Sequence, residues 1–196
     1  MKQIITISRQ YASGGRTIGA KVAQRLGYAF YDTQIIRDTM RRTGLAAQTV
    51  EDTEQRVTNS FLFNLVMGVD IARNNVKKIE QAERELIRSY VRQGPCVIVG
   101  RSANFVLEDV PAEQVLNAYL YAGKAERLAY AVRHYGVEEA QARQRIEQTD
   151  KERRLYTASF YGREWGDKRN YDLLLNSGRL GIEACVNLLC RAAEAE

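Results

Sequence analysis

Short apolar runs alternate along this chain with longer stretches in which apolar residues recur every three or four positions. Runs of the first kind are typical of strands that helices cover on both faces, and stretches of the second kind are typical of amphipathic helices. Five runs predict strands, and these are Ile4–Ile7, Tyr28–Tyr31, Cys96–Val99, Ala118–Ala122 and Asp172–Leu175. Because helices are predicted between them, we expect a three-layer α/β fold in which helices flank a five-stranded, mostly parallel sheet.

The stretch between the second and third predicted strands is expected to be helical. Residues 47–93 carry no strong strand signal, and their apolar positions end in a charged amphipathic helix over Ile79–Val91. Within this stretch, the cluster Phe61-Leu62-Phe63 fits core packing, a base-stacking surface or a dimer surface. A homo-oligomer therefore stays open.

The chain is expected to form a single domain. Its 196 residues, 45% of them hydrophobic, are enough for one sizeable core, and with only two prolines it has no proline-rich linker. The domain would span 1–196, with a core of 1–45 and 94–196 and a helical insert of about 46–93.

A later helix is predicted over 124–135, directly after the fourth strand. Its apolar positions Leu128 and Val132 are expected to face inward, whereas His134, near the helix end at Gly136, is expected at the surface. His134 is the single histidine of the chain, so a multi-histidine metal site is excluded.

Cysteine usage and the N-terminal sequence favour a cytoplasmic protein. The cysteines lack metal-ligand spacing, and two of them sit among apolar residues; they are Cys96, Cys185 and Cys190. The chain leads from Met1 straight into a short strand, without the apolar region that a signal peptide needs, and no run approaches transmembrane length. We therefore expect a reducing compartment and no membrane partner.

Basic residues outnumber acidic ones by 29 to 24, which gives a net charge of +5. They concentrate in residues 25–42, 73–92 and 143–169, and this suits an anionic partner. Acidic residues are mixed through the same segments, so ordinary solvated helices explain the pattern as well. We expect small anionic molecules as partners and no nucleic acid; a nucleic-acid-binding module is the weaker alternative.

The first predicted strand runs into the glycine-centred turn Ser13-Gly14-Gly15-Arg16-Thr17, which opens a helix. In a phosphate-binding loop, GxxxxGK[ST], glycines let backbone N–H groups approach the phosphates, the lysine reaches the terminal phosphate and the hydroxyl binds Mg²⁺. This chain has Gln10 in place of the first glycine and Arg16 in place of the lysine. A helix N-terminus carries about half a positive charge and favours a bound anion. The alternative is an ordinary strand-to-helix turn.

Polar residues and glycines also follow the other predicted strands. Asp32, Arg101, Gly123 and Asn176 each come directly after a strand. Because the carboxyl ends of parallel strands meet at one edge of a sheet, these positions are expected to converge on the Gly14-Gly15 loop. This convergence favours phosphate binding over an ordinary turn.

Taken in order, these segments resemble the cytidylate kinase-like branch of the P-loop nucleoside monophosphate kinases, nearly from end to end. The motifs that carry the resemblance are Ile7-Ser8-Arg9-Gln10-Tyr11-Ala12-Ser13-Gly14-Gly15-Arg16, Phe30-Tyr31-Asp32, Val99-Gly100-Arg101, Asp150-Lys151-Glu152-Arg153, Trp165-Gly166-Asp167 and Tyr171-Asp172-Leu173-Leu174-Leu175-Asn176-Ser177. The resemblance implies a P-loop NTPase fold, and phosphoryl transfer from ATP to a nucleoside monophosphate, most of all CMP or dCMP.

On the matching positions, the resemblance implies roles for the loop residues. The phosphates of ATP would be held by Ser13, Gly14, Gly15, Arg16 and Thr17. The Thr17 hydroxyl would bind Mg²⁺, and Arg16 would take the catalytic part of the usual lysine. Asp32, at a strand end near the loop, would add charge on the metal side and help to bind the substrate.

The resemblance also implies an acceptor site and a lid. Arg37 and Arg101 would grip the phosphate of the acceptor, Asp150 would read its sugar or base, and Arg153 would approach the transferring phosphate as a catalytic arginine with Arg16 and Arg101. Residues of about 150–170 would form a lid that excludes water. Outside the resemblance, Arg153 also fits a solvated charged helix.

The sequence departs from cytidylate kinases at several of these positions. Arg16 replaces a lysine, Ser102 follows Arg101 where those enzymes carry an acidic residue, Lys151 replaces a serine and Ile146 replaces a lid arginine. An arginine prefers planar bidentate contacts and does not follow a moving phosphoryl group as a lysine does. The acceptor therefore stays open, and a regulatory or sensing protein that binds nucleotide with little kinase activity is the alternative.

Overall fold

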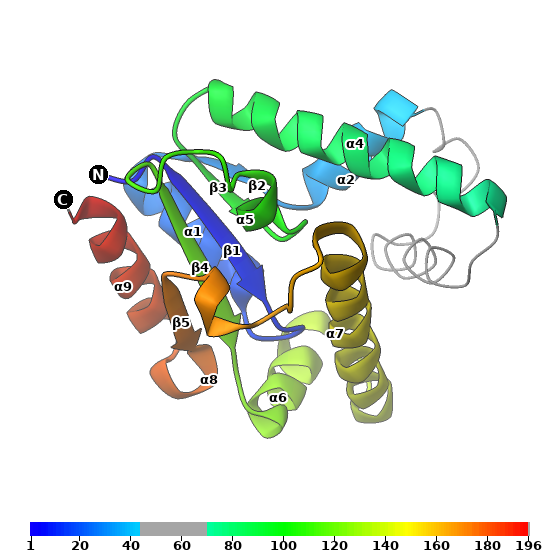
Figure 1. Ribbon diagram of the computed structural model, residues 1–196. Coiled ribbons are helices and arrows are strands. Elements are labelled where there is room, and N and C mark those ends of the chain that lie inside the picture. Colours follow the sequence, from blue (N-terminus) through cyan, green and yellow to red (C-terminus); the bar gives the residue numbers. More distant parts are fainter. Residues whose placement is uncertain (44–69, 196) are drawn as a thin grey trace.

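Five strands form one sheet, in the spatial order β2-β3-β1-β4-β5 (Figure 1). Their bounds are β1 Ile4–Arg9, β2 Ala29–Tyr31, β3 Cys96–Val99, β4 Val115–Tyr121 and β5 Leu173–Asn176. All four pairings between neighbouring strands are parallel. This computed structural model describes residues 1–43 and 70–195, and within them the predicted α/β fold with a five-stranded parallel sheet is confirmed.

Helices connect the strands and cover both faces of the sheet (Figure 1). Their bounds are α1 Gly15–Leu26, α2 Thr33–Thr43, α4 Asp70–Arg92, α5 Ala103–Val106, α6 Lys124–Tyr135, α7 Glu139–Tyr161, α8 Ser177–Leu180 and α9 Ile182–Glu194, with a short 3-10 helix, η1, over Lys168–Asn170. The predicted charged helix of the insert lies within α4. The Phe61-Leu62-Phe63 cluster lies outside the described residues.

One face of the sheet packs against α1 and α9. Alternate residues of the central strands, such as Ile5 of β1 and Val97 of β3, are fully buried there against Val22 of α1 and Leu189 of α9. Side chains alternate between the two faces of a strand, so a continuous apolar run serves both layers at once. This explains why the strands appear in the sequence as unbroken apolar segments.

The opposite face packs against α4 and α5. Ile4 of β1 and Ile98 of β3 point to this side, where they join Ile87 of α4 and Val106 of α5 in a second buried cluster. The sheet thus forms the middle of three layers. Its carboxyl edge carries the loop between β1 and α1, with α6 and α7 beside that loop (Figure 1).

The orientation predicted for the helix over 124–135 is wrong in one respect. Val132 is 42% exposed, whereas Arg127 and Ala131 are buried and Leu128 is half-buried. The reason is that α6 packs against α7 and the loop after β1 rather than over the sheet, so its buried stripe is rotated by one residue. The exposed position predicted for His134 is confirmed.

Residues 150–161, assigned to the predicted lid, form the second half of α7. Asp150 and Tyr156 are buried in this half, and the helix ends at Gly162, whose φ of 61° stops it in a left-handed conformation. The lid itself stays a prediction. Of the helices in the described part of the chain, none is both long and apolar enough to cross a membrane.

Candidate functional site

The loop between β1 and α1 brings the start of a 12-residue helix to the carboxyl edge of the sheet. Ala12 and Gly14 have φ values of 59° and 73°, which reverse the chain sharply before Gly15. The Ser13 hydroxyl lies 2.9 Å from the Gln10 carbonyl oxygen to which it donates, and the Ser177 hydroxyl donates to the Ser13 carbonyl oxygen at 2.7 Å. These bonds fix the loop from inside and from α8.

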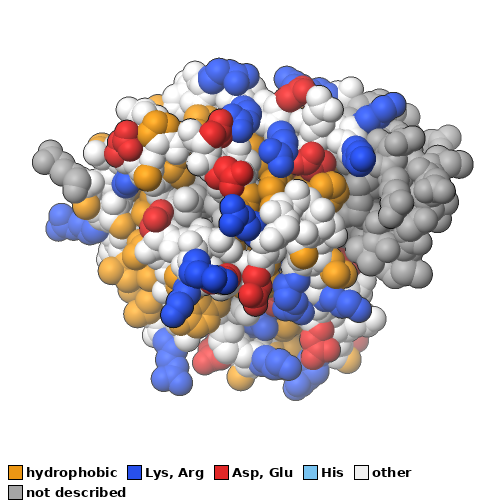
Figure 2. Space-filling model, viewed as in Figure 1, with side chains coloured by type: hydrophobic (Ala, Val, Ile, Leu, Met, Phe, Trp, Pro, Cys, Tyr) orange, Lys and Arg blue, Asp and Glu red, His pale blue; other side chains and the backbone are white. Residues whose placement is uncertain are grey.

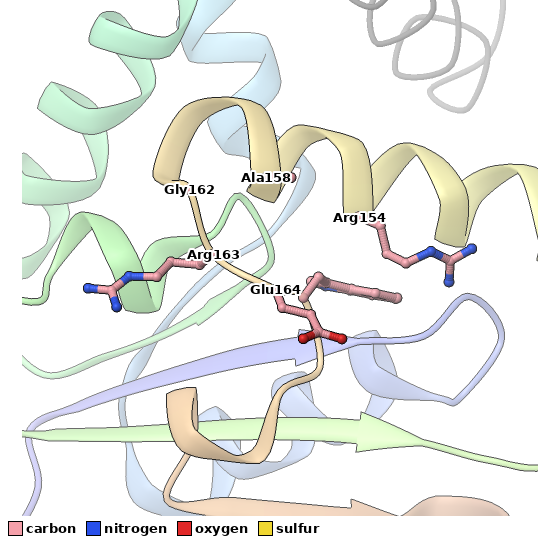
Figure 3. A pocket seen from close by; sticks show the side chains of 6 residues that line it. Arg154, Ala158, Gly162, Arg163 and Glu164 are labelled. Carbon is pink, nitrogen blue, oxygen red and sulfur yellow. The ribbon is translucent and has the colours of Figure 1, made fainter.

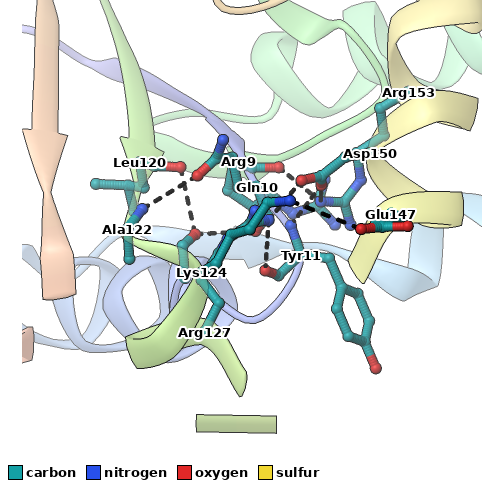
Figure 4. A network of polar contacts seen from close by, with 11 residues as sticks. Arg9, Gln10, Tyr11, Leu120, Ala122, Lys124, Arg127, Glu147, Asp150 and Arg153 are labelled. Carbon is teal, nitrogen blue, oxygen red and sulfur yellow. Dashed lines mark hydrogen bonds and ion pairs between the residues drawn. The ribbon is translucent and has the colours of Figure 1, made fainter. Parts of the chain in front are cut away.

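Gln10, which stands where a phosphate-binding loop usually has its first glycine, is held by the neighbouring strand. Its backbone N–H donates to the carbonyl oxygen of Leu120 at 2.9 Å, and its side-chain oxygen accepts from the Ala122 N–H at 3.1 Å (Figure 4). The side chain therefore extends along β4. A glutamine is accommodated because the residue that follows β4 supplies a backbone donor at this point.

Asp32, at the carboxyl end of β2, is buried and lies between two arginines. Its two carboxylate oxygens lie 3.5 Å from Arg9 Nη2 and 3.1 Å from Arg16 Nε. Arg16 extends from the first turn of α1 and its side chain is 59% exposed, whereas the side chain of Arg9 is 22% exposed. Two predicted site residues, Arg16 and Asp32, are thus in direct contact.

Asp150 ties α7 to the loop. One of its oxygens accepts the Tyr11 N–H at 2.8 Å, and the other pairs with Arg127 of α6 at 2.5 Å (Figure 4). Arg153, one turn further along α7, donates from Nη1 to the carbonyl oxygen of Arg9 at 2.6 Å and lies 3.9 Å from Asp150 Oδ1. The structure therefore brings Asp150 and Arg153 to the loop, although Asp150 lies 139 positions after Tyr11 and Arg153 lies 144 positions after Arg9 in the sequence.

Arg101 lies after β3 in the same part of the sheet edge. It has a φ of 55°, and its Nη1 atom lies 3.3 Å from Oε1 of the buried Glu83 of α4. The other oxygen of Glu83 accepts from the Tyr156 hydroxyl at 2.8 Å. Burial and the charge of Glu83 raise the pKa of Tyr156, so this phenol stays neutral as a donor. α4 and α7 thereby hold Arg101 in place.

The charges in this region are unbalanced. Five arginines face four carboxylates; the arginines are Arg9, Arg16, Arg101, Arg127 and Arg153, and the carboxylates are Asp32, Glu83, Asp150 and Glu152. Burial lowers the pKa of Arg9 and of Arg153, and the positive charge of Arg9 lowers the pKa of Arg153 further. Excess positive charge at the N-terminus of a helix favours an anion.

The remaining predicted residues lie around this cluster. Thr17 is exposed at the start of α1, and its hydroxyl lies 2.9 Å from the Tyr130 hydroxyl. Arg37 is exposed on α2, where it donates to the Thr33 hydroxyl at 3.4 Å, and the contacts above do not join it to the cluster. Within the described residues, no group of three or more His, Cys, Asp or Glu side chains could hold a metal ion.

Among the described residues, the protein therefore offers Mg²⁺ no cluster of three or more carboxylates. Mg²⁺ is commonly bound by one or two protein groups together with substrate phosphates and water. The exposed Thr17 hydroxyl, at the first turn of α1, suits this mode, whereas the nearby Asp32 carboxylate is occupied by two guanidinium groups. The residues therefore fit a Mg²⁺ ion that arrives with a nucleotide.

A shallow pocket of about 400 Å³ opens beside the second half of α7 (Figure 3). It is lined by Arg154, Ala158, Gly162, Arg163, Glu164 and Trp165. The Trp165 ring packs edge-on against Tyr119 of β4, with their centroids 5.4 Å apart. On the face of the molecule drawn in Figure 2, which has the same orientation as Figure 1, acidic and basic side chains are interspersed, so no extended patch of one sign dominates it.

Sequence reasoning missed three residues of the cluster: Arg9, Glu83 and Arg127. Arg9 had a signal, because a charged residue that ends a mostly apolar strand is placed at the carboxyl edge. Arg127 had none, because the apolar positions Leu128 and Val132 predicted a different inward stripe for this helix. Glu83 had no such signal, since its contacts depend on how α4 lies against α7.

A comparison with known protein families gives a match that spans most of the chain. A model of the cytidylate kinase-like family matches residues 4–179. A search among curated proteins found no match.

Solved structures with a similar fold cover almost the whole chain. An uncharacterized protein from Eubacterium ventriosum is 20% identical, with a TM-score of 0.72, over 98% of this chain and 99% of its own. A shikimate kinase from Bacteroides thetaiotaomicron is 15% identical, with a TM-score of 0.55, over 98% of both chains. The protein TT1252 from Thermus thermophilus is 16% identical, with a TM-score of 0.56, over 98% of this chain and 97% of its own.

Proposed function

Because the chain belongs to the cytidylate kinase-like family, we propose that it transfers a phosphoryl group from ATP to a nucleoside monophosphate, with CMP and dCMP as the preferred acceptors. The family and the P-loop kinase fold support nucleotide-dependent phosphoryl transfer in general. The observation that carries the proposal is the cluster of arginines around the loop from Gln10 to Gly14, where the unbalanced positive charge matches the phosphates of two substrates.

The donor would bind at the loop. Backbone N–H groups from Ser13 to Thr17 and the start of α1 would hold the phosphates of ATP, because helix N-termini stabilise anions. Mg²⁺, when bound with ATP, supplies charge neutralisation between the phosphates. The Thr17 hydroxyl would be its protein ligand, and this requires the Tyr130 hydroxyl to exchange its contact with Thr17.

The acceptor would bind between the loop and α4. Arg101, held by Glu83, and Arg37 on α2 would bind its phosphate. Asp32, which pairs with Arg16 beside the loop, would help to bind the substrate. Arg16 and Arg153 would offset the charge that develops on the transferring group, which is the main task of a protein in this reaction. Asp150 is already bonded to Tyr11 and Arg127, so any contact with the acceptor would come through its remaining lone pairs.

The alternative is a nucleotide-binding regulator with little kinase activity. The contact between Arg16 and Asp32 favours it, since the residue that replaces the catalytic lysine is partly neutralised by a buried carboxylate. Chemistry would then require this ion pair to open. In either case nucleotides are the proposed partners, and a cytoplasmic location stays a prediction.

The test is ADP release from Mg·ATP by the purified protein, with CMP, dCMP, UMP, AMP and GMP as acceptors. Shikimate belongs in the panel because one protein of similar fold is a shikimate kinase. Arg16→Ala and Arg153→Ala should each lose turnover while the protein stays folded, with a lower thermal stability for Arg153→Ala because it loses the bond to the Arg9 carbonyl oxygen. Arg88→Ala is the control, because Arg88 forms an ion pair with Asp109 away from the loop and its side chain is 39% exposed, between those of Arg153 and Arg16.

The outcomes separate the two candidates. Turnover that requires one monophosphate and is lost in both variants would establish the kinase and identify its acceptor. ATP binding without ADP release for any acceptor would favour the regulator. Full rates in both variants would contradict the roles assigned to these arginines.

A further inference from the structure

Arg9 lies between the loop that follows β1 and the turn that follows β3, and two glycines make room for its side chain. A β-carbon added to Gly15 would lie 2.7 Å from Cβ and Cγ of Arg9, and one added to Gly100 would lie 1.8 Å from its Nη1 atom. The side chain therefore passes across the start of α1 and ends over the turn after β3. Any larger residue at either glycine would displace it.

The guanidinium group of Arg9 is surrounded mainly by positive charge. Asp32 lies 3.5 Å away, but this carboxylate also pairs with Arg16 at 3.1 Å. Arg16 and Arg101 both lie close enough to lower the pKa of Arg9, and burial lowers it more than either. Like charges that share one buried counter-ion destabilise each other, and this cost is reduced when an anion binds between them.

The backbone of the same residue fixes it from the other side. The Arg9 carbonyl oxygen accepts from Arg153 Nη1 at 2.6 Å, so α7 holds the end of β1 in place (Figure 4). Arg9 thus has a fixed backbone, a defined path for its side chain and a guanidinium group with one shared counter-ion. A guanidinium held in this way is prepared for a planar, bidentate contact.

We propose that Arg9 binds the terminal phosphate of the nucleotide donor, from the side of Arg101, and that it shares the role of the missing loop lysine with Arg16. The inference rests on the proposed donor site at the loop. Asp32 holds Arg9 and Arg16 in position before the nucleotide binds, and the terminal phosphate then takes over part of its contacts. Arg16, which is largely exposed, approaches from outside, whereas Arg9 approaches from within the sheet edge.

The experiment compares ATP with ADP, which differ only in the terminal phosphate. Calorimetry would measure the dissociation constants of both nucleotides for the unmodified protein and for Arg9→Gln. We expect Arg9→Gln to weaken ATP binding by about tenfold or more, as for the loss of a charged hydrogen bond, and to change ADP binding by less than about twofold. Arg88→Gln is the control that removes an ion-paired arginine elsewhere.

A second variant keeps the charge and moves it. Gly100→Ala places a methyl group on the position of Arg9 Nη1, so the guanidinium must shift although the arginine remains. We expect the same selective loss of ATP affinity, with a lower thermal stability because Gly100 has a φ of 86°. If Arg9→Gln does not fold, Arg9→Lys retains the charge, and its expected loss for ATP is smaller but still selective.

The outcomes distinguish this inference from the proposed function. Equal losses for ATP and ADP in Arg9→Gln would mean that Arg9 only supports the loop, and would overturn the inference alone. If the unmodified protein binds neither nucleotide, the proposed function fails, and the role of Arg9 fails with it. A selective loss for ATP in both Arg9→Gln and Gly100→Ala would support the assignment.

Discussion

The ion pair between Asp150 and Arg127 is expected to be the contact on which the position of the loop depends most. Both side chains are at least nine-tenths buried, and Asp150 also accepts the backbone N–H of Tyr11. Asp150→Ala would leave the Arg127 guanidinium buried without its carboxylate, and its Nε atom already lacks a hydrogen-bond partner. Removing one member of such a pair costs about 3–5 kcal/mol, because the remaining charge stays desolvated.

This magnitude can be measured by urea unfolding and by calorimetry. In a protein of this length, a loss of about 4 kcal/mol corresponds to a decrease in Tm of roughly 8–16 °C. The control is Glu139→Ala, which removes the exposed pair between Glu139 and Arg143 on the same helix and is expected to cost less than about 1 kcal/mol.

A double variant tests whether the loss of stability comes from the unpaired charge of Arg127. Arg127→Met combined with Asp150→Leu removes both charges and keeps apolar volume, so it should recover a large part of the loss seen in Asp150→Ala. If Asp150→Ala costs no more than the exposed control, the desolvated pair does not hold α6, α7 and the loop together, and the reasoning is refuted.

Three further predictions concern packing, thiol reactivity and the pH dependence of stability. Gly19→Ala places a β-carbon 2.7 Å from Val99 Cγ2 between α1 and the sheet, and we expect it to cost about 1–3 kcal/mol in urea unfolding, whereas Ala20→Ser on the same helix should cost less than half as much. Burial raises the pKa of Cys96 to about 11 and also raises the pKa values of Cys185 and Cys190. At pH 8, none of these three thiols should therefore react with a thiol reagent until urea unfolds the protein. Reaction of the folded protein at the rate of a free thiol would contradict the buried core. Since the Cys96 thiol of the folded protein still keeps its proton when the unfolded thiol has lost it, its contribution to stability should fall as pH rises from about 8.5 towards 11.

The sheet was predictable because its strands are buried on both faces. Runs such as Cys96–Val99 contain only apolar residues, and this leaves little choice between a strand and a solvent-facing segment. The residue that follows each strand is then placed at the carboxyl edge by topology alone. Asp32 and Arg101 could be assigned to one site on this ground, before the contacts of either residue were known.

The contacts of the site were less predictable, because they depend on the direction of long side chains and on how helices pack. Arg127 reaches Asp150 only because α6 turns a different stripe inward than its apolar residues indicate. Glu83 meets Arg101, which lies 18 positions later in the sequence, through the packing of α4 against the sheet. The periodicity of apolar residues predicts that one face of a helix is buried. It does not predict which residues lie at the centre of that face when a buried charged pair competes with an apolar residue.

The same packing gives a physical reason for arginine in place of lysine in this loop. A lysine carries one compact ammonium group on a flexible stem, so a lysine paired with Asp32 would have its whole charge held by that carboxylate. A guanidinium can contact this carboxylate through Nε and still present its terminal nitrogens to a phosphate, because its five donors point in different directions in one plane. The replacement therefore fits a site in which the cations are held in position by buried carboxylates before the substrate arrives, and such a site depends on Asp32 as much as on the arginines.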